Sequence, residues 1–146
     1  MSTPDECNQE DFSQTACGFV LEFEDIILWH NMNNTNTNVG GWPASDLRLY
    51  INETIYDSIP NELKNAILNT KVISGHGYTD GENNFISVDK LYLLSPKEVQ
   101  YDTRFDSAAD NTRVLDYYKT DSDSKRIKYN SKGYPAYWWL RTAYYS

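Results

Sequence analysis

His76 is the residue of this chain best suited to proton-transfer chemistry. It lies between Gly75 and Gly77 in a short polar segment, where an imidazole can serve as a general base or as a metal ligand. No serine or cysteine is tied to it by spacing, so a nucleophilic triad is not predicted. Because a loop histidine is more often simply solvated, an enzyme that uses His76 is an alternative hypothesis and not the leading one.

The segment YTDGENNFISVD, residues 78–89, carries three carboxylates that suit a hard cation. The candidate metal ligands are Asp80, Glu82 and Asp89, and oxygen ligands of this kind are typical of calcium sites. Their spacing does not match the EF-hand loop, and acidic turn residues are common in globular proteins. We therefore predict no cofactor and keep calcium at this loop as the alternative.

The C-terminal segment YPAYWWLRTAYYS, residues 134–146, has the composition of a recognition surface. Strand side chains alternate, so a strand here that turns Trp138 toward the core turns Trp139 and Arg141 the other way. Trp, Tyr and Arg dominate the energetics of binding interfaces, which makes the outward side a candidate contact surface. The predicted ligand-binding residues are Trp139, Arg141, Tyr144 and Tyr145, with Asn34 and Asn36 from the asparagine-rich loop at residues 31–38.

The composition is that of an acidic, globular chain. Its 146 residues include 13 Lys and Arg against 21 Asp and Glu, and the net charge of −8 argues against a nucleic-acid partner. No apolar run approaches the roughly 18 residues of a membrane-spanning helix, so no membrane insertion is predicted. Residues 1–17 show no recognisable secretion signal. The 4 Trp, 12 Tyr and 5 Phe can supply a core, because each aromatic ring buries about 150–250 Å².

Residues 1–16 are polar and show no periodicity, so we expect a flexible leader followed by a single domain at residues 17–146. Cys7 and Cys17 stand ten positions apart. They can close a disulfide in an oxidising compartment, or they can be two unrelated thiols in a loose segment, and the second interpretation is favoured. Neither belongs to a CxxC pair, so a zinc or redox site is not predicted.

The predicted strands lie at both ends and in the middle of the chain. Residues 19–23 alternate between apolar and polar types, which predicts a half-buried strand. Residues 71–74 also have the pattern of a strand, and residues 90–94 are apolar enough to cross the core. A final strand is predicted at residues 136–142.

The predicted helices are short and begin with recognisable signals. Ser45 is a candidate N-cap for a helix with an apolar stripe over residues 47–55. Pro60 begins a second helix whose buried side includes Leu63. Residues 95–98 (SPKE) have the capping-box pattern, which predicts a third short helix directly after a buried strand. Strands and short helices in this order predict an α+β domain.

Four ordered motifs resemble a bacterial domain family of unknown function (number 6273), found mainly in cell-surface, secreted and prophage-associated proteins. The family pattern GGWxxSx(L/M)R falls on residues 40–48, and LPx(E/D)L falls on residues 59–63 with isoleucine first. The block DK(L/I)(F/W/Y)LLSxxEV falls on residues 89–99. WWLRS falls on residues 138–142, where Thr142 replaces the usual serine, and the resemblance covers roughly residues 18–146.

The resemblance implies a C-type-lectin-like fold, with short helices packed on a small, twisted, mostly antiparallel sheet. The family is related in outline to formylglycine-generating enzymes and to retroelement-diversified ligand-binding proteins, and it has no assigned activity. The cysteines of those enzymes have no counterpart near the C-terminus of this chain, and the calcium-binding EPN and WND triplets of sugar-binding lectins are absent. Members usually continue through a further hairpin and a closing strand, so we expect a fold that is incomplete at its C-terminus. The strand at residues 19–23 would then present an open edge that can pair with another chain.

The leading hypothesis is a non-enzymatic ligand-binding or adhesion module of a bacterial surface or prophage-derived protein. Its ligand would be a protein or a glycan, and the resemblance implies an extracellular or cell-surface location. One alternative is a structural spacer or truncated fragment without a ligand. The other is an enzyme of the formylglycine-generating-like class that uses His76 or the carboxylates of residues 80–89. We expect a structural role, and no ligand contact, for Trp42, Arg48 and Trp138.

Overall fold

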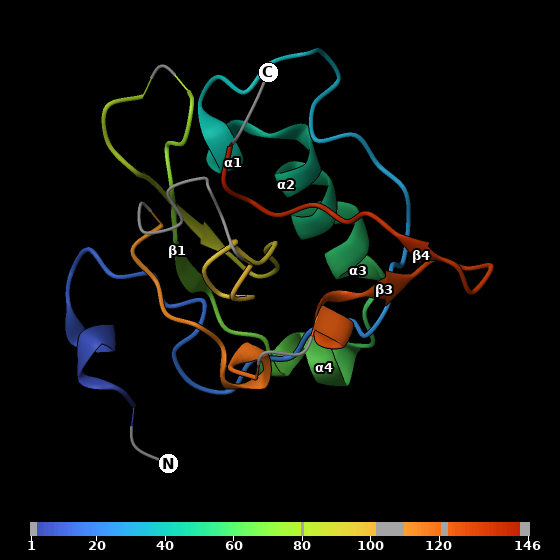
Figure 1. The fold of residues 1–146 in the computed structure, drawn as a ribbon, viewed down its shortest axis with the longest axis horizontal. Coiled ribbons are helices and arrows are strands. Elements are labelled where there is room, and N and C mark those ends of the chain that lie inside the picture. Colours follow the sequence, from blue (N-terminus) through green and yellow to red (C-terminus); the bar gives the residue numbers. More distant parts are fainter. Residues whose placement is uncertain (1–2, 80, 102–109, 121–122, 144–146) are drawn as a thin grey trace.

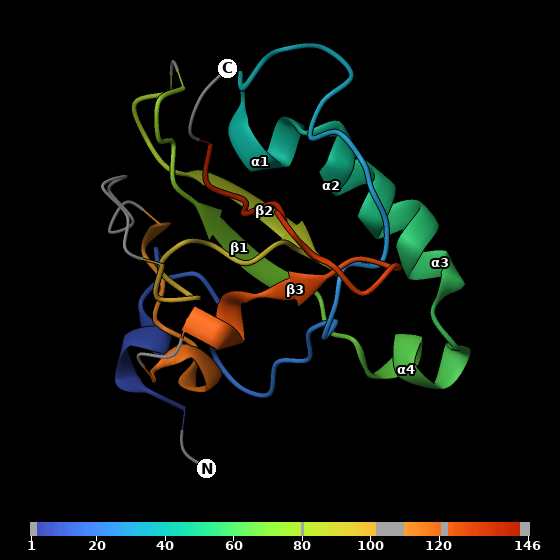
Figure 2. The same cartoon turned by 45° about the vertical axis from the view of Figure 1, so that its right-hand side comes forward.

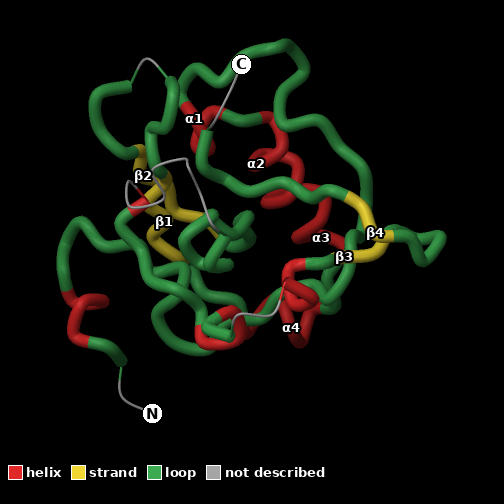
Figure 3. Tube along the Cα trace, viewed as in Figure 1, coloured by secondary structure: helices red, strands yellow, loops and turns green. Residues whose placement is uncertain are grey.

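The computed structural model of the protein describes residues 3–79, 81–101, 110–120 and 123–143. Its regular elements are short, and most of the chain follows irregular backbone (Figure 3). The helical elements are η1 (Asp5–Asn8), α1 (Gly41–Ala44), α2 (Asp46–Tyr50), the π-helical η2 (Ile51–Ile55), α3 (Tyr56–Ser58), α4 (Asn61–Ala66), η4 (Asp116–Tyr118) and η5 (Asp123–Arg126). The strands are β1 (Thr70–Ser74), β2 (Phe85–Asp89), β3 (Lys128–Tyr129) and β4 (Pro135–Ala136). The prediction of a small α+β domain with short helices and antiparallel pairing is confirmed.

Helices α1 to α3 follow one another along one side of the molecule, beside the β1–β2 hairpin (Figures 1 and 2). The Ser45 hydroxyl accepts a hydrogen bond from the Arg48 amide at 3.2 Å, so Ser45 is the N-cap of α2 as predicted. Leu63 of α4 is 40% exposed, and the prediction that it is buried is wrong. The reason is that α4 has six residues and lies at the outer end of this helical run, where little surface covers it. No helix among the described residues is long and apolar enough to span a bilayer.

Strands β1 and β2 form an antiparallel hairpin that runs from Thr70 opposite Asp89 to Ser74 opposite Phe85. Strand β1 confirms the strand predicted at residues 71–74. The second sheet is smaller and pairs β3 with β4 over two positions. Figures 1 and 2 show that the C-terminal segment, coloured red, leaves β4 and runs back across the molecule toward α1.

The remaining predicted strands do not form in the described part of the chain. Residues 19–23 contain no strand, and Phe19 is 92% exposed, so the sheet edge expected there is not built. Residues 90–94 are not a strand either, although Leu94 is buried, and the C-terminal strand is limited to β4. Alternation indicates which side chains would share a face, but a strand also needs a neighbour whose backbone groups match its own.

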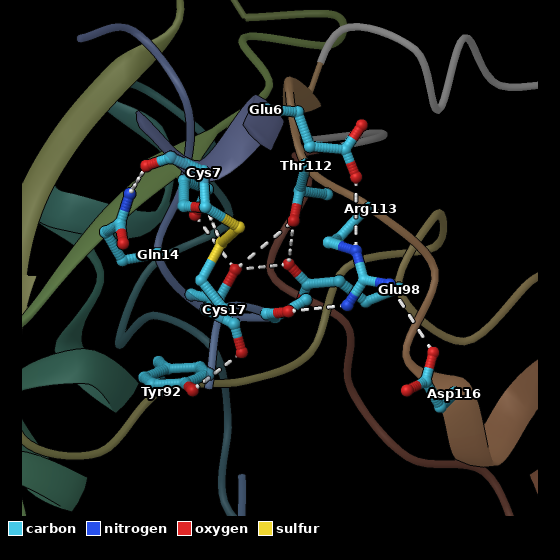
Figure 4. The surroundings of a disulfide bond; sticks show 12 residues. Glu6, Cys7, Gln14, Cys17, Tyr92, Glu98, Thr112, Arg113 and Asp116 are labelled. Atoms are coloured by element: carbon cyan, nitrogen blue, oxygen red, sulfur yellow. Dashed lines mark hydrogen bonds and ion pairs between the residues drawn. A yellow bond between two sulfur atoms is a disulfide. The ribbon is translucent and has the colours of Figure 1, made fainter. Parts of the chain in front are cut away.

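The segment before residue 17 is packed into the domain and differs from the flexible leader we expected. Phe12, Thr15 and Ala16 are each at most 5% exposed. Cys7 and Cys17 form a disulfide, so the interpretation as two unrelated thiols is wrong (Figure 4). A backbone hydrogen bond joins the segment to β1, which makes it part of the interior.

The double substitution Cys7→Ser/Cys17→Ser is expected to lower the free energy of unfolding by about 3 kcal/mol, because the cross-link restricts the unfolded chain. Urea denaturation with and without a reductant measures this difference. Reductant should lower the stability of the wild type to that of the variant and leave the variant unchanged. A wild type that is insensitive to reductant would contradict a stabilising disulfide.

Candidate functional site

A groove of about 960 Å³ lies between the asparagine-rich loop 31–38 and the C-terminal segment 138–143. These two segments are far apart in the sequence, and the fold brings them together. Trp42 of α1, Tyr78 and Tyr101 complete part of the lining. The volume is at the upper end of the roughly 300–1,000 Å³ typical of small-molecule sites.

Hydrogen bonds to the first turn of α2 hold the asparagine-rich loop in place. The Asp46 amide donates to Asn33 Oδ1 at 3.0 Å, and the Asn34 amide donates to Asp46 Oδ2 at 2.7 Å. Asn33 Nδ2 also donates to the carbonyl of Thr37 at 2.8 Å. Asn34 and Asn36 are exposed, and their side chains form no hydrogen bond with another described residue. The loop is thus internally fixed while these two carboxamides face outward.

The two tryptophans of the C-terminal segment lie as predicted, one half-buried and one exposed. Trp138 packs against the core cluster, and its Nε1 donates to the carbonyl of Arg126 at 2.9 Å. Trp139 is 52% exposed and lines the groove. Its Nε1 donates to the carbonyl of His30 at 3.0 Å. This bond holds the indole beside the asparagine-rich loop, which begins at the next residue.

Arg141 is buried, and the prediction that it faces outward beside Trp139 is wrong. Its Nη1 and Nη2 donate to the two carboxylate oxygens of Glu98 at 2.7 Å each, and both side chains are fully buried. It also donates to the carbonyls of Leu93 and Ile73. The expectation failed because it assumed the alternation of a regular strand, and β4 ends at Ala136. The Arg141 amide donates to the carbonyl of Leu94 at 3.0 Å, which fixes the backbone here while the side chain turns inward to Glu98.

Glu98 is surrounded by donors. The Ser95 amide donates to Oε1 at 3.1 Å, and the Glu98 amide donates to the Ser95 hydroxyl, so the predicted capping box is present, on a turn and not a helix. Thr112 donates to Oε2 at 2.8 Å (Figure 4). Thr15 donates to the same oxygen. Burial alone would raise the pKa of Glu98, but Arg141 and these donors outweigh burial and hold the pKa below its ordinary value.

The candidate metal ligands do not come together in the described residues. Asp89 is buried and accepts hydrogen bonds from Trp42 Nε1 at 2.9 Å and from Arg48 Nε at 2.7 Å, so its carboxylate is engaged in the architecture. Glu82 is exposed, and Asp80 lies outside the described residues. Within the part of the chain that the structure describes, no three His, Cys, Asp or Glu side chains are grouped to hold a metal ion.

The other predicted site residues do not form a catalytic arrangement that the structure describes. His76 Nδ1 lies 3.1 Å from the carbonyl of Gly77. Both cysteines are consumed by the disulfide, so no thiol nucleophile is available to this imidazole. Tyr144 and Tyr145 lie outside the described residues.

Three residues that matter to this region carry no signal of that role in the sequence. Tyr78 and Tyr101 are exposed and line the groove, but each stands alone in a polar segment without a periodic pattern. The sequence pattern indicates Glu98 only as the capping residue of the turn at residues 95–98. Its pairing with Arg141, 43 positions away, has no signal in local spacing.

Residues 18–146 match the sequence profile of a protein family described as a domain of unknown function, DUF6273. The chain belongs to the DUF6273 family. No curated protein and no solved structure matches it. In this DUF6273 domain the buried ion pair joins two of the motifs identified in the sequence, because Glu98 lies in the block at residues 89–99 and Arg141 in the block at residues 138–142.

The substitution Arg141→Met is expected to lower the free energy of unfolding by about 3–5 kcal/mol, because it leaves Glu98 buried without its cation. The double variant Arg141→Met/Glu98→Gln should recover part of this loss, since no buried charge is left unpaired. As a control, Lys119→Ala removes an exposed ion pair with Asp116 and should leave the denaturation midpoint nearly unchanged. Similar midpoints for Arg141→Met and Lys119→Ala would contradict the role of the buried pair.

Acid is expected to remove the stabilisation that Glu98 provides. The folded state holds the pKa of Glu98 below its ordinary value of 4.5, so this contribution is complete above that pH and is lost as pH falls through the folded pKa. Asp110 acts in the opposite sense, because burial raises the pKa of its carboxyl.

Urea denaturation of the wild type and of Glu98→Gln, from about pH 7 to about pH 3, isolates the contribution of Glu98. The wild type should lose stability below about pH 4.5 more steeply than the variant, since only the wild type has this carboxylate to protonate. Parallel curves for the two proteins would show that Glu98 does not carry the acid sensitivity.

Proposed function

We propose that this DUF6273 domain is a non-enzymatic ligand-binding or adhesion module, with its ligand in the groove between residues 31–38 and 138–143. The observation that carries this proposal is the placement of exposed Trp139 beside a loop that exposes the carboxamides of Asn34 and Asn36. An aromatic ring supplies contact area at low entropic cost, and amides supply adaptable hydrogen bonds. This combination is typical of recognition surfaces.

The walls of the groove are held in place before any ligand arrives. The hydrogen bond from the Trp139 indole to the His30 carbonyl joins one wall to the start of the other. Two positions later, the ion pair between Arg141 and Glu98 anchors the backbone of the C-terminal segment. A site that is already ordered loses less conformational entropy on binding, which supports a role in recognition.

The same proposal includes a C-type-lectin-like arrangement and an extracellular or cell-surface location, in a bacterial surface or prophage-derived protein. The disulfide between Cys7 and Cys17 supports this location, because such bonds persist in oxidising compartments. The small α+β architecture and the four sequence motifs support the lectin-like arrangement.

Screening the purified protein on printed arrays of oligosaccharides and peptides tests the proposal. Trp139→Ala is expected to weaken binding to a groove ligand by at least about tenfold, because a tryptophan that contacts a ligand is a typical hot spot. Trp29→Ala is the matched control, since Trp29 is 84% exposed and is not part of the groove lining. It should leave binding unchanged, and thermal unfolding should show that both variants are folded.

Two outcomes would overturn the proposal. Binding that Trp29→Ala weakens and Trp139→Ala does not would place the ligand away from the groove. A folded wild type that binds nothing on either array would favour a structural spacer.

A further inference from the structure

The described residues that line the groove carry no net charge, although the chain is acidic. Among its described lining residues Arg141 has the one charged side chain, and the carboxylate of Glu98 neutralises it below the surface. The chain as a whole has a net charge of −8. A site for phosphate, sulfate or carboxylate groups needs available cations, and a site for a cation favours carboxylates. The described part of the lining offers neither, which fits an uncharged ligand.

The polar side chains at the groove can both donate and accept hydrogen bonds. Asn34 and Asn36 each present a carbonyl acceptor and an amino donor, and the hydroxyl of Thr35 lies between them in the sequence. A sugar hydroxyl also donates and accepts. Two hydroxyls on adjacent ring carbons can therefore satisfy both groups of one carboxamide, which a purely apolar ligand cannot do.

Exposed aromatic rings lie on the same groove. Trp139, Tyr78 and Tyr101 all line it and are all more than half exposed. The indole of Trp139 is held through its Nε1, and the residue is 52% exposed, so part of its surface is accessible to a ligand. A sugar ring has an apolar face of C–H groups and a rim of hydroxyls, so it can lie on such a ring while its rim reaches polar groups.

We infer that the groove binds an uncharged oligosaccharide through ring contacts and carboxamide hydrogen bonds, without a metal ion. This inference rests on the proposed function of the groove and names the chemical class of its ligand. The groove offers no carboxylate among its described lining residues to ligate calcium. Neither wall is a strand in the described segments, so the groove lacks the sheet edge to which extended peptides frequently add.

Titration of the full chain with neutral glucose, mannose and N-acetylglucosamine oligomers, followed by calorimetry, tests this inference. We expect saturable binding that is unchanged by EDTA and unchanged between about 50 mM and about 500 mM salt, because no ion pair is screened. Trp139→Ala and Asn34→Ala should each weaken binding by at least about tenfold. Asn65→Ala is the matched control, because Asn65 is exposed on α4 and is not part of the groove lining.

The possible results separate this inference from the proposed function. Trp139-dependent binding to arrayed peptides alone, or to sulfated or sialylated glycans with strong salt dependence, would overturn the neutral-sugar class and keep the groove as the binding site. Loss of sugar binding on addition of EDTA would overturn the metal-free mode. The absence of any Trp139-dependent binding to sugars or peptides would overturn the inference and the proposed function together.

Discussion

The buried ion pair between Glu98 and Arg141 is the interaction on which the rest of the structure depends. Both side chains are fully buried, so only bidentate geometry and additional hydrogen bonds offset the cost of removing two charges from water. Partners come from the disulfide-closed segment, from β1 and from the chain before η4, through Thr15, Ile73 and Thr112. A domain with little regular structure thus gains a polar centre that fixes how its irregular segments meet.

This polar centre is not arranged for maximal stability. In the described part of the chain, Arg141 Nε, Asp110 Oδ2 and Ser74 Oγ are buried without a hydrogen-bond partner. An unsatisfied buried group costs about 1–3 kcal/mol, and apolar residues of similar volume often replace a buried ion pair without loss. We therefore expect the pair to contribute mainly by specifying one arrangement. That arrangement includes the backbone two positions after Trp139, and with it the shape of the groove.

Local signals in the sequence predicted local structure, and they failed where a distant partner decides the outcome. The N-cap at Ser45 and the capping box at residues 95–98 were predicted because each is complete within four residues. The strand at residues 19–23 and the outward direction of Arg141 were not correct. Both predictions followed from the alternation of side chains along an assumed strand. That alternation holds only where a neighbouring strand provides backbone hydrogen bonds, and the C-terminal pairing of β3 with β4 ends at Ala136.

The candidate site shows the same limit within a single loop. Its asparagines are equivalent in the sequence, but the fold divides four of them into two groups. Asn33 and Asn38 bond to the protein, through Asp46 and Thr37 for the first and the carbonyl of Tyr78 for the second. The carboxamides of Asn34 and Asn36 face solvent. Composition alone could select the loop, but only tertiary hydrogen bonding separates the residues that build it from those available to a ligand.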